Sequence, residues 1–121
     1  MAEPVLTVDH VEPDTVCVAP HGDLDFATAY RFDAAVQRIQ HAGPSTLVVD
    51  LRDVDFVDSA GVGRLVAIAR RGRQLGERVC FVRGPRAVTR LFALTGVGAG
   101  ISWIRSPEEA GMQPDPPPAA S

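Results

Sequence analysis

Residues 46–75 constrain the fold of this chain more than any other stretch. They begin with an apolar run at 46–51, continue through a short polar loop at 52–58, and then enter a helical pattern at Ser59. A continuous apolar run is typical of a central strand in a parallel sheet, because both faces of such a strand are covered. This order of strand, loop and helix predicts a layered α/β fold with Ser59 at the start of a helix, where its hydroxyl can cap a free backbone N–H.

The rest of the chain alternates between strand and helix patterns. Apolar strand patterns occupy residues 5–11, 16–19, 46–51, 79–82 and 101–104, and helical patterns begin near residues 28, 59, 85 and 106. Because helices between strands act as crossovers, we expect a mixed, mostly parallel sheet of about five strands with the helices packed on it. The order is an N-terminal hairpin followed by β-α-β-α-β-α-β-α. Residues 1–112 should form one domain, and the proline-rich residues 113–121 a disordered tail.

Composition limits the class of protein and its partners. The 121 residues are enough for one compact domain, and 45% hydrophobic with 22% charged residues is typical of a soluble globular protein. A net charge of −3 disfavours nucleic acid as a direct partner. No apolar run is long enough to span a membrane, and the N-terminus lacks a secretion signal, so we expect a cytoplasmic protein. We expect a monomer or a weak dimer.

The cysteines and histidines do not suggest a metal site. Cys17 and Cys80 each lie inside an apolar run, which predicts buried thiols rather than a disulfide. Neither the two cysteines nor the three histidines show the paired spacing of metal ligands. We therefore expect no metal and no other cofactor.

Ser59 has a setting that first suggests a hydrolase nucleophile, whose pattern is Gly-x-Ser-x-Gly. Gly61 matches the second glycine, but residue 57 is valine. That fold also requires a histidine after the nucleophile, whereas all three histidines precede Ser59. The sequence therefore predicts no catalytic residues and no enzyme.

A glycine-rich helix start can also bind the phosphates of a nucleotide, because its backbone N–H groups are free. Here position 66 is valine where a dinucleotide fingerprint needs glycine, and no Gly-Lys-Ser/Thr occurs. Asp58 would also repel a free phosphate. These features still permit a phosphate attached to Ser59 by a partner. Asp58 then has two open roles, as an oxygen ligand for the partner's magnesium ion or as support for the helix cap.

Four segments form a pattern that spans most of the chain. Residues 48–51 read Val-Val-Asp-Leu, and residues 54–65 read Val-Asp-Phe-Val-Asp-Ser-Ala-Gly-Val-Gly-Arg-Leu. Residues 22–25 read Gly-Asp-Leu-Asp, and residues 88–97 read Val-Thr-Arg-Leu-Phe-Ala-Leu-Thr-Gly-Val. In order and spacing, over roughly residues 5–110, these segments resemble the STAS-domain anti-sigma-factor antagonists.

The resemblance implies a role in partner switching. In that family, the unphosphorylated antagonist binds an anti-sigma factor and releases the sigma factor. The anti-sigma factor is commonly also a serine kinase that phosphorylates the antagonist, and a serine phosphatase reverses the reaction. The acceptor would be Ser59, because the next position, often a second hydroxyl residue in the family, is Ala60. The surroundings of the site would be Asp23, Asp25, Asp58, Ala60, Gly61 and Val62.

A different reading of the same pattern is an interaction or scaffold module that is never phosphorylated, within a larger signalling complex. The presence of both Ser59 and Asp58 favours the switch over this alternative.

Overall fold

The computed structural model describes residues 6–95 and 101–112. Its main sheet contains strands β1 (Leu6–Glu12), β2 (Thr15–Pro20), β4 (Thr46–Asp50), β6 (Arg78–Val82) and β7 (Ser102–Ile104). The strand order is β1-β2-β4-β6-β7, in which β1 and β2 are antiparallel and every later pair is parallel. The predicted mixed, mostly parallel sheet is therefore confirmed.

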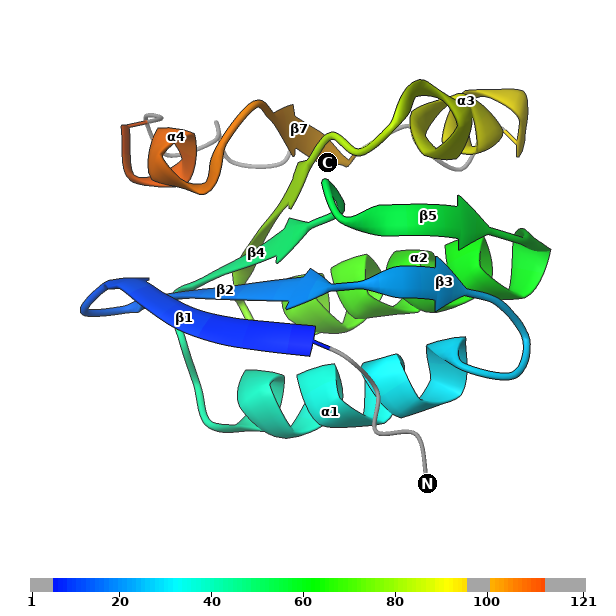
Figure 1. The fold of residues 1–121 in the computed structure, drawn as a ribbon. Coiled ribbons are helices and arrows are strands. Elements are labelled where there is room, and N and C mark those ends of the chain that lie inside the picture. The colour runs from blue at the N-terminus through cyan, green and yellow to red at the C-terminus, as the bar shows by residue number, and fades with distance from the viewer. Residues whose placement is uncertain (1–5, 96–100, 113–121) are drawn as a thin grey trace.

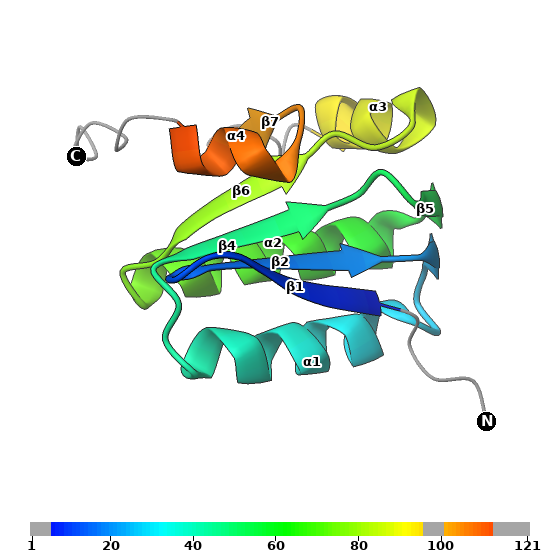
Figure 2. The same ribbon diagram turned by 60° about the vertical axis from the view of Figure 1, so that its left-hand side comes forward.

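The helices cover both faces of this sheet. Helices α1 (Ala29–His41) and α2 (Ser59–Gln74) lie side by side on one face, and α4 (Pro107–Met112) lies on the other (Figures 1 and 2). The larger core cluster joins α1 and α2 to the sheet through residues such as Phe32, Val36, Leu47, Leu65 and Ile68. A smaller cluster on the opposite face contains Cys17, Val48, Cys80, Val82, Ile104 and Ala110.

Aromatic contacts hold helix α3 (Arg86–Thr95) against the far edge of the sheet. Phe92 from α3 packs edge-on against Trp103 of β7, with ring centroids 5.3 Å apart, and lies 6.4 Å from Phe81 of β6. Such pairs add to the stabilisation that burial of the rings provides. The predicted tail at 113–121 lies outside the described residues.

Two short strands were absent from the predicted order. β3 (Gly22–Leu24) and β5 (Val54–Val57) pair in parallel and form a second, two-stranded sheet. The sequence predicted a polar loop over residues 52–58, which was wrong for Val54–Val57, and it predicted no strand at residues 22–24. In Figure 1 this small sheet lies beyond the carboxyl ends of β2 and β4, next to the first turns of α1 and α2.

Strand register keeps the two cysteines apart. Cys17 pairs with Val48, and Val48 pairs with Cys80, so a whole strand separates the thiols. Two strand spacings amount to about 9.6 Å, beyond the roughly 7 Å limit for the Cα atoms of a disulfide. Both cysteines are buried and free, as predicted.

Candidate functional site

Asp58 fixes the start of helix α2. It is the N-cap residue, and its Oδ1 accepts a hydrogen bond from the backbone N–H of Gly61 at 2.9 Å. Its Oδ2 accepts a second bond from the backbone N–H of Phe26 at 3.1 Å. The sequence predicted the hydroxyl of Ser59 as the cap, but Ser59 is the first residue of the helix and the aspartate before it makes the capping bond. Of the two roles left open for Asp58, the structure shows capping.

Ser59 presents its side chain to solvent in the first turn of α2. Both Ser59 and Ala60 are exposed. The backbone carbonyl of Asp58 accepts a hydrogen bond from the N–H of Val62, and the Asp58 carboxylate accepts one from the N–H of Gly61. Within the described part of the chain, the backbone N–H groups of Ser59 and Ala60 have no acceptor. A phosphate at this position would meet two free donors and the positive end of the helix dipole.

Asp25 stabilises the loop that faces this helix start. Its Oδ1 accepts bonds from the backbone N–H of Ala27 at 3.0 Å and of Thr28 at 3.1 Å. The hydroxyl of Thr28 donates to the carbonyl oxygen of Asp23 at 2.8 Å, and the side chain of Asp23 is exposed. These bonds fix the shape of the loop between β3 and α1. The hydrogen bond from the backbone N–H of Phe26 to Asp58 holds the same loop next to the start of α2.

Gly61 and Val62 contribute packing rather than exposed groups. A β-carbon at Gly61 would collide with the carbonyl oxygen of Leu24 in β3. The side chain of Val62 is 4% exposed and belongs to the main core. Val57 is also buried. The predicted site residues therefore come together at one end of the molecule, but Gly61 and Val62 position the helix start and offer no side chain to a partner.

Three exposed aromatic side chains lie in the segments next to the site, and the sequence patterns did not identify them. Phe26 is 80% exposed in the loop before α1, and Phe56 is 52% exposed in β5. Tyr30, in the first turn of α1, is also exposed. The signal was available, because Phe26 directly follows the segment at residues 22–25 and Phe56 lies in the loop predicted at residues 52–58. We call Phe26, Tyr30 and Phe56, together with Ser59, the aromatic face.

No arrangement for a metal ion is found in the described residues, where no three His, Cys, Asp or Glu side chains converge. None of the helices in this part of the chain is long and apolar enough to cross a membrane.

Comparisons with known proteins identify the fold family. Residues 7–110 match the family model of the STAS domain, which covers most of the chain. The chain therefore belongs to the STAS domain family, and the resemblance stated from the sequence is confirmed.

Three solved structures illustrate this relationship. An anti-sigma factor antagonist from Mycobacterium paratuberculosis is 25% identical, with a TM-score of 0.75 over 89% of this chain and 91% of that one. The Thermotoga maritima protein TM1081 is 22% identical, with a TM-score of 0.80 over 88% and 92%. The Bacillus cell fate determinant SpoIIAA in its phosphorylated form is 21% identical, with a TM-score of 0.68 over 89% and 97%. The chain thus shares its fold with anti-sigma factor antagonists along nearly its whole described length.

Proposed function

We propose that this protein is an anti-sigma-factor antagonist controlled by phosphorylation of Ser59. The unphosphorylated protein binds an anti-sigma factor with serine kinase activity, and the sigma factor is released. The kinase transfers the γ-phosphate of ATP to the Ser59 hydroxyl, and a serine phosphatase removes it. The observation that carries this proposal is the exposed hydroxyl of Ser59 in the first turn of α2. Asp58 fixes that turn by its capping bond, and Asp25 fixes the loop that faces it.

The helix start accommodates the phosphate within this protein. Phosphorylation adds about −1.5 to −2 charges at neutral pH. The free N–H groups of Ser59 and Ala60 and the helix dipole stabilise that charge, so we expect the fold to survive modification. The capping bonds of Asp58 come from backbone groups that the phosphate does not need.

The same charge opposes docking of the partner. The aromatic face offers the exposed apolar area that protein interfaces use for their anchors, with Phe26 the most exposed. A partner seated on it would have to desolvate a hydrated dianion next to Asp58 and Asp23. Disturbing an interface in this way costs roughly 2–5 kcal/mol, which weakens binding by about 30-fold to several thousand-fold. A change of that size is enough to exchange partners.

Phosphate mapping tests the assignment of Ser59. Incubation with the cognate kinase, ATP and Mg²⁺ should add one phosphate, which fragmentation mass spectrometry locates on Ser59. The Ser59→Ala variant should take up none, whereas Ser45→Ala, which removes an exposed hydroxyl before β4, should be modified like the parent. Phosphate found only on Thr28 or Thr89 would refute the assignment. No phosphate at all, with the partner still bound, would favour the scaffold module instead.

A further inference from the structure

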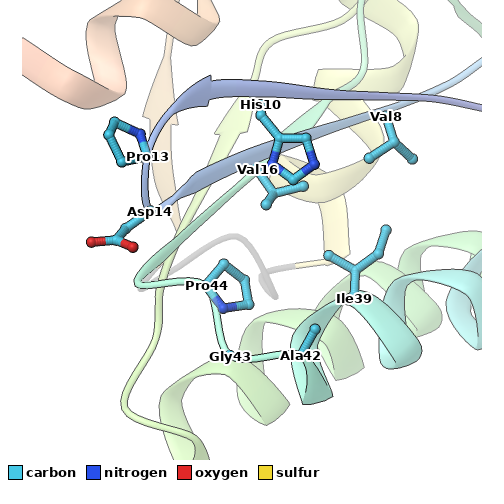
Figure 3. A pocket seen from close by; sticks show the side chains of 9 residues that line it. All are labelled: Val8, His10, Pro13, Asp14, Val16, Ile39, Ala42, Gly43 and Pro44. Atoms are coloured by element: carbon cyan, nitrogen blue, oxygen red, sulfur yellow. The ribbon is translucent and has the colours of Figure 1, made fainter.

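A hollow lies at the opposite end of α1 from Ser59. It has a volume of about 300 Å³ and lies between the β1–β2 hairpin and the last turn of α1 (Figure 3). Helix α1 has 13 residues, so roughly 20 Å of helix separates this hollow from the aromatic face. The hollow therefore belongs to a different surface, and a ligand could bind there whether or not Ser59 is phosphorylated.

Most of the walls are apolar. Val8 and Val16 line it from the hairpin, Ile39 from α1, Ala42 from the C-cap of that helix, and Pro13 and Pro44 from the two connections. Val8 stays 43% exposed although it lies on the sheet face that α1 and α2 cover elsewhere. A volume of this size is at the lower end of the range for small-molecule sites, which are mainly apolar with a few polar groups.

His10 supplies the polar group inside the hollow. Its imidazole points from β1 towards Pro44 and Ile39 (Figure 3). Within the described residues, it makes no hydrogen bond or ion pair. A neutral imidazole has one ring nitrogen that accepts a hydrogen bond and one that donates. The ring can therefore bind one polar atom of a small molecule.

The charges around the hollow favour a positive ligand. Asp14 lies at its hairpin end, and Ala42 and Gly43 form its border at the carboxyl end of α1. That end of a helix carries a partial negative charge, which stabilises cations. The basic side chains of the last turn, Arg38 and His41, are exposed and do not line the hollow.

We infer that the hollow binds a small organic amine. Its apolar body packs against Val8, Val16 and Ile39, and its ammonium group donates to the ring of His10, with the negative charge of Asp14 at the hairpin end of the hollow. The size of the hollow favours a small molecule over a protein segment, because nine residues line it, whereas a stable protein interface takes about 20–30 residues on each partner.

Three probes with the same phenylethyl body separate the contributions to binding. We would titrate the ¹⁵N-labelled protein at pH 7.5 with 2-phenylethylamine, 2-phenylethanol and 3-phenylpropanoate, and follow the amide signals. The amine should shift the signals of Val8, His10, Ala42 and Gly43 with a dissociation constant of about 1 mM, as expected for a ligand of its size. The alcohol should bind more weakly, and the carboxylate at least about fivefold more weakly than the amine.

Four variants assign the site. Ala42→Trp, which fills the hollow from an exposed position, should abolish binding, and His10→Leu should weaken the amine about fivefold. Asp14→Asn should weaken the amine several-fold and leave the alcohol unchanged. His41→Leu, on the exposed side of the same helix turn, is the matched control and should change nothing.

The inference would be overturned by equal or tighter binding of the carboxylate, by shifts confined to other regions, or by no shift at 20 mM amine. Signals that change only with protein concentration would also overturn it, because a second copy would then occupy the hollow.

Discussion

Two glycines in the first turns of α2 have different roles, although the sequence makes them look alike. Gly61 is buried against the backbone of β3, where a β-carbon would meet the carbonyl oxygen of Leu24. Gly63 is exposed, and a β-carbon there would meet nothing within 4 Å. The close approach at Gly61 lets α2 begin against β3, beside the loop whose Phe26 N–H binds Asp58.

Alanine at these two positions should therefore have opposite effects on stability. Gly61→Ala forces α2 and β3 apart and should lower the free energy of unfolding by about 1–3 kcal/mol. Gly63→Ala only removes backbone freedom in an exposed helix and should raise it by about 0.5–1 kcal/mol. Urea unfolding of both variants checks this. If Gly61→Ala proved as stable as the parent, the close contact between α2 and β3 would be wrong.

Sequence reasoning at this scale identified the residues of the site but not all of their roles. Asp58 was recognised beside Ser59, yet the partner of its second oxygen is a backbone N–H in a distant loop. The need for glycine at position 61 likewise comes from Leu24, which no local pattern reveals. Roles that depend on such long-range backbone contacts could be learned only from the fold.

At the scale of elements, one aspartate joins α2 to β3 and to the loop that follows β3. The carboxylate of Asp58 caps α2 and also binds the loop that connects β3 to α1. Its backbone N–H donates to the carbonyl of Leu24 at 3.3 Å, which links the same residue to β3 itself. The aromatic face therefore depends on Asp58 for its shape.

Substitutions that remove one or both oxygens of the Asp58 carboxylate should lower the free energy of unfolding by increasing amounts. Asp58→Asn retains one side-chain oxygen as an acceptor and should cost about 1 kcal/mol, whereas Asp58→Ala loses both bonds and should cost about 2 kcal/mol. The exposed Asp55 in β5 provides the control, since Asp55→Ala should leave stability within about 0.5 kcal/mol. Thermal unfolding monitored by circular dichroism measures all three. Equal stability of Asp58→Ala and the parent would contradict the capping role.

The main strands and helices could be predicted because their patterns are long and their apolar faces are clear. β3 and β5 could not, because their three and four residues are too few to show an alternating pattern and, unlike those of the equally short β7, include charged side chains. The polar residues in both segments are typical of loops, so no strand was predicted in either. Their pairing with each other, which brings Asp23 opposite Phe56, follows from the geometry of the main sheet.

At the scale of the whole molecule, a polar network around the buried side chains of Asp33, Gln40 and Glu77 joins α1 to α2. Asp33 accepts bonds from Arg64 at 3.2 Å and from Arg71 at 2.9 Å. Arg71 also donates to the side-chain oxygen of Gln40, whose amide nitrogen donates to Oε1 of Glu77 at 2.8 Å. Periodicity in the sequence describes one helix at a time, so it could not show that Arg71 has partners on another helix.

Glu77 makes this network sensitive to pH. The residue is 8% exposed, and its Oε2 has no hydrogen-bond partner within the described residues. Burial raises the pKa of this carboxyl group, and the bond from Gln40 and the charge of Arg71 offset the rise only in part. Because the folded state favours the protonated form, the contribution of Glu77 to stability is greatest below its unfolded pKa. It falls as the pH rises through the folded pKa.

The neutral variant Glu77→Gln should remove this dependence. It should unfold at a higher temperature than the parent at pH 8, and the difference should disappear near pH 4. Glu108→Gln, in the exposed first turn of α4, is the matched control. Melting temperatures across this pH range provide the measurement. A constant difference between Glu77→Gln and the parent at all pH values would rule out titration of Glu77 as the cause.

The central claim is that one phosphate on Ser59 switches partner binding while the fold is retained. The most direct test is to measure, by calorimetry, the dissociation constant of the cognate anti-sigma factor for the unmodified protein and for the protein phosphorylated on Ser59. Binding should weaken by at least about 30-fold on phosphorylation, with an unchanged circular dichroism spectrum. Equal affinity of the two forms would contradict the account.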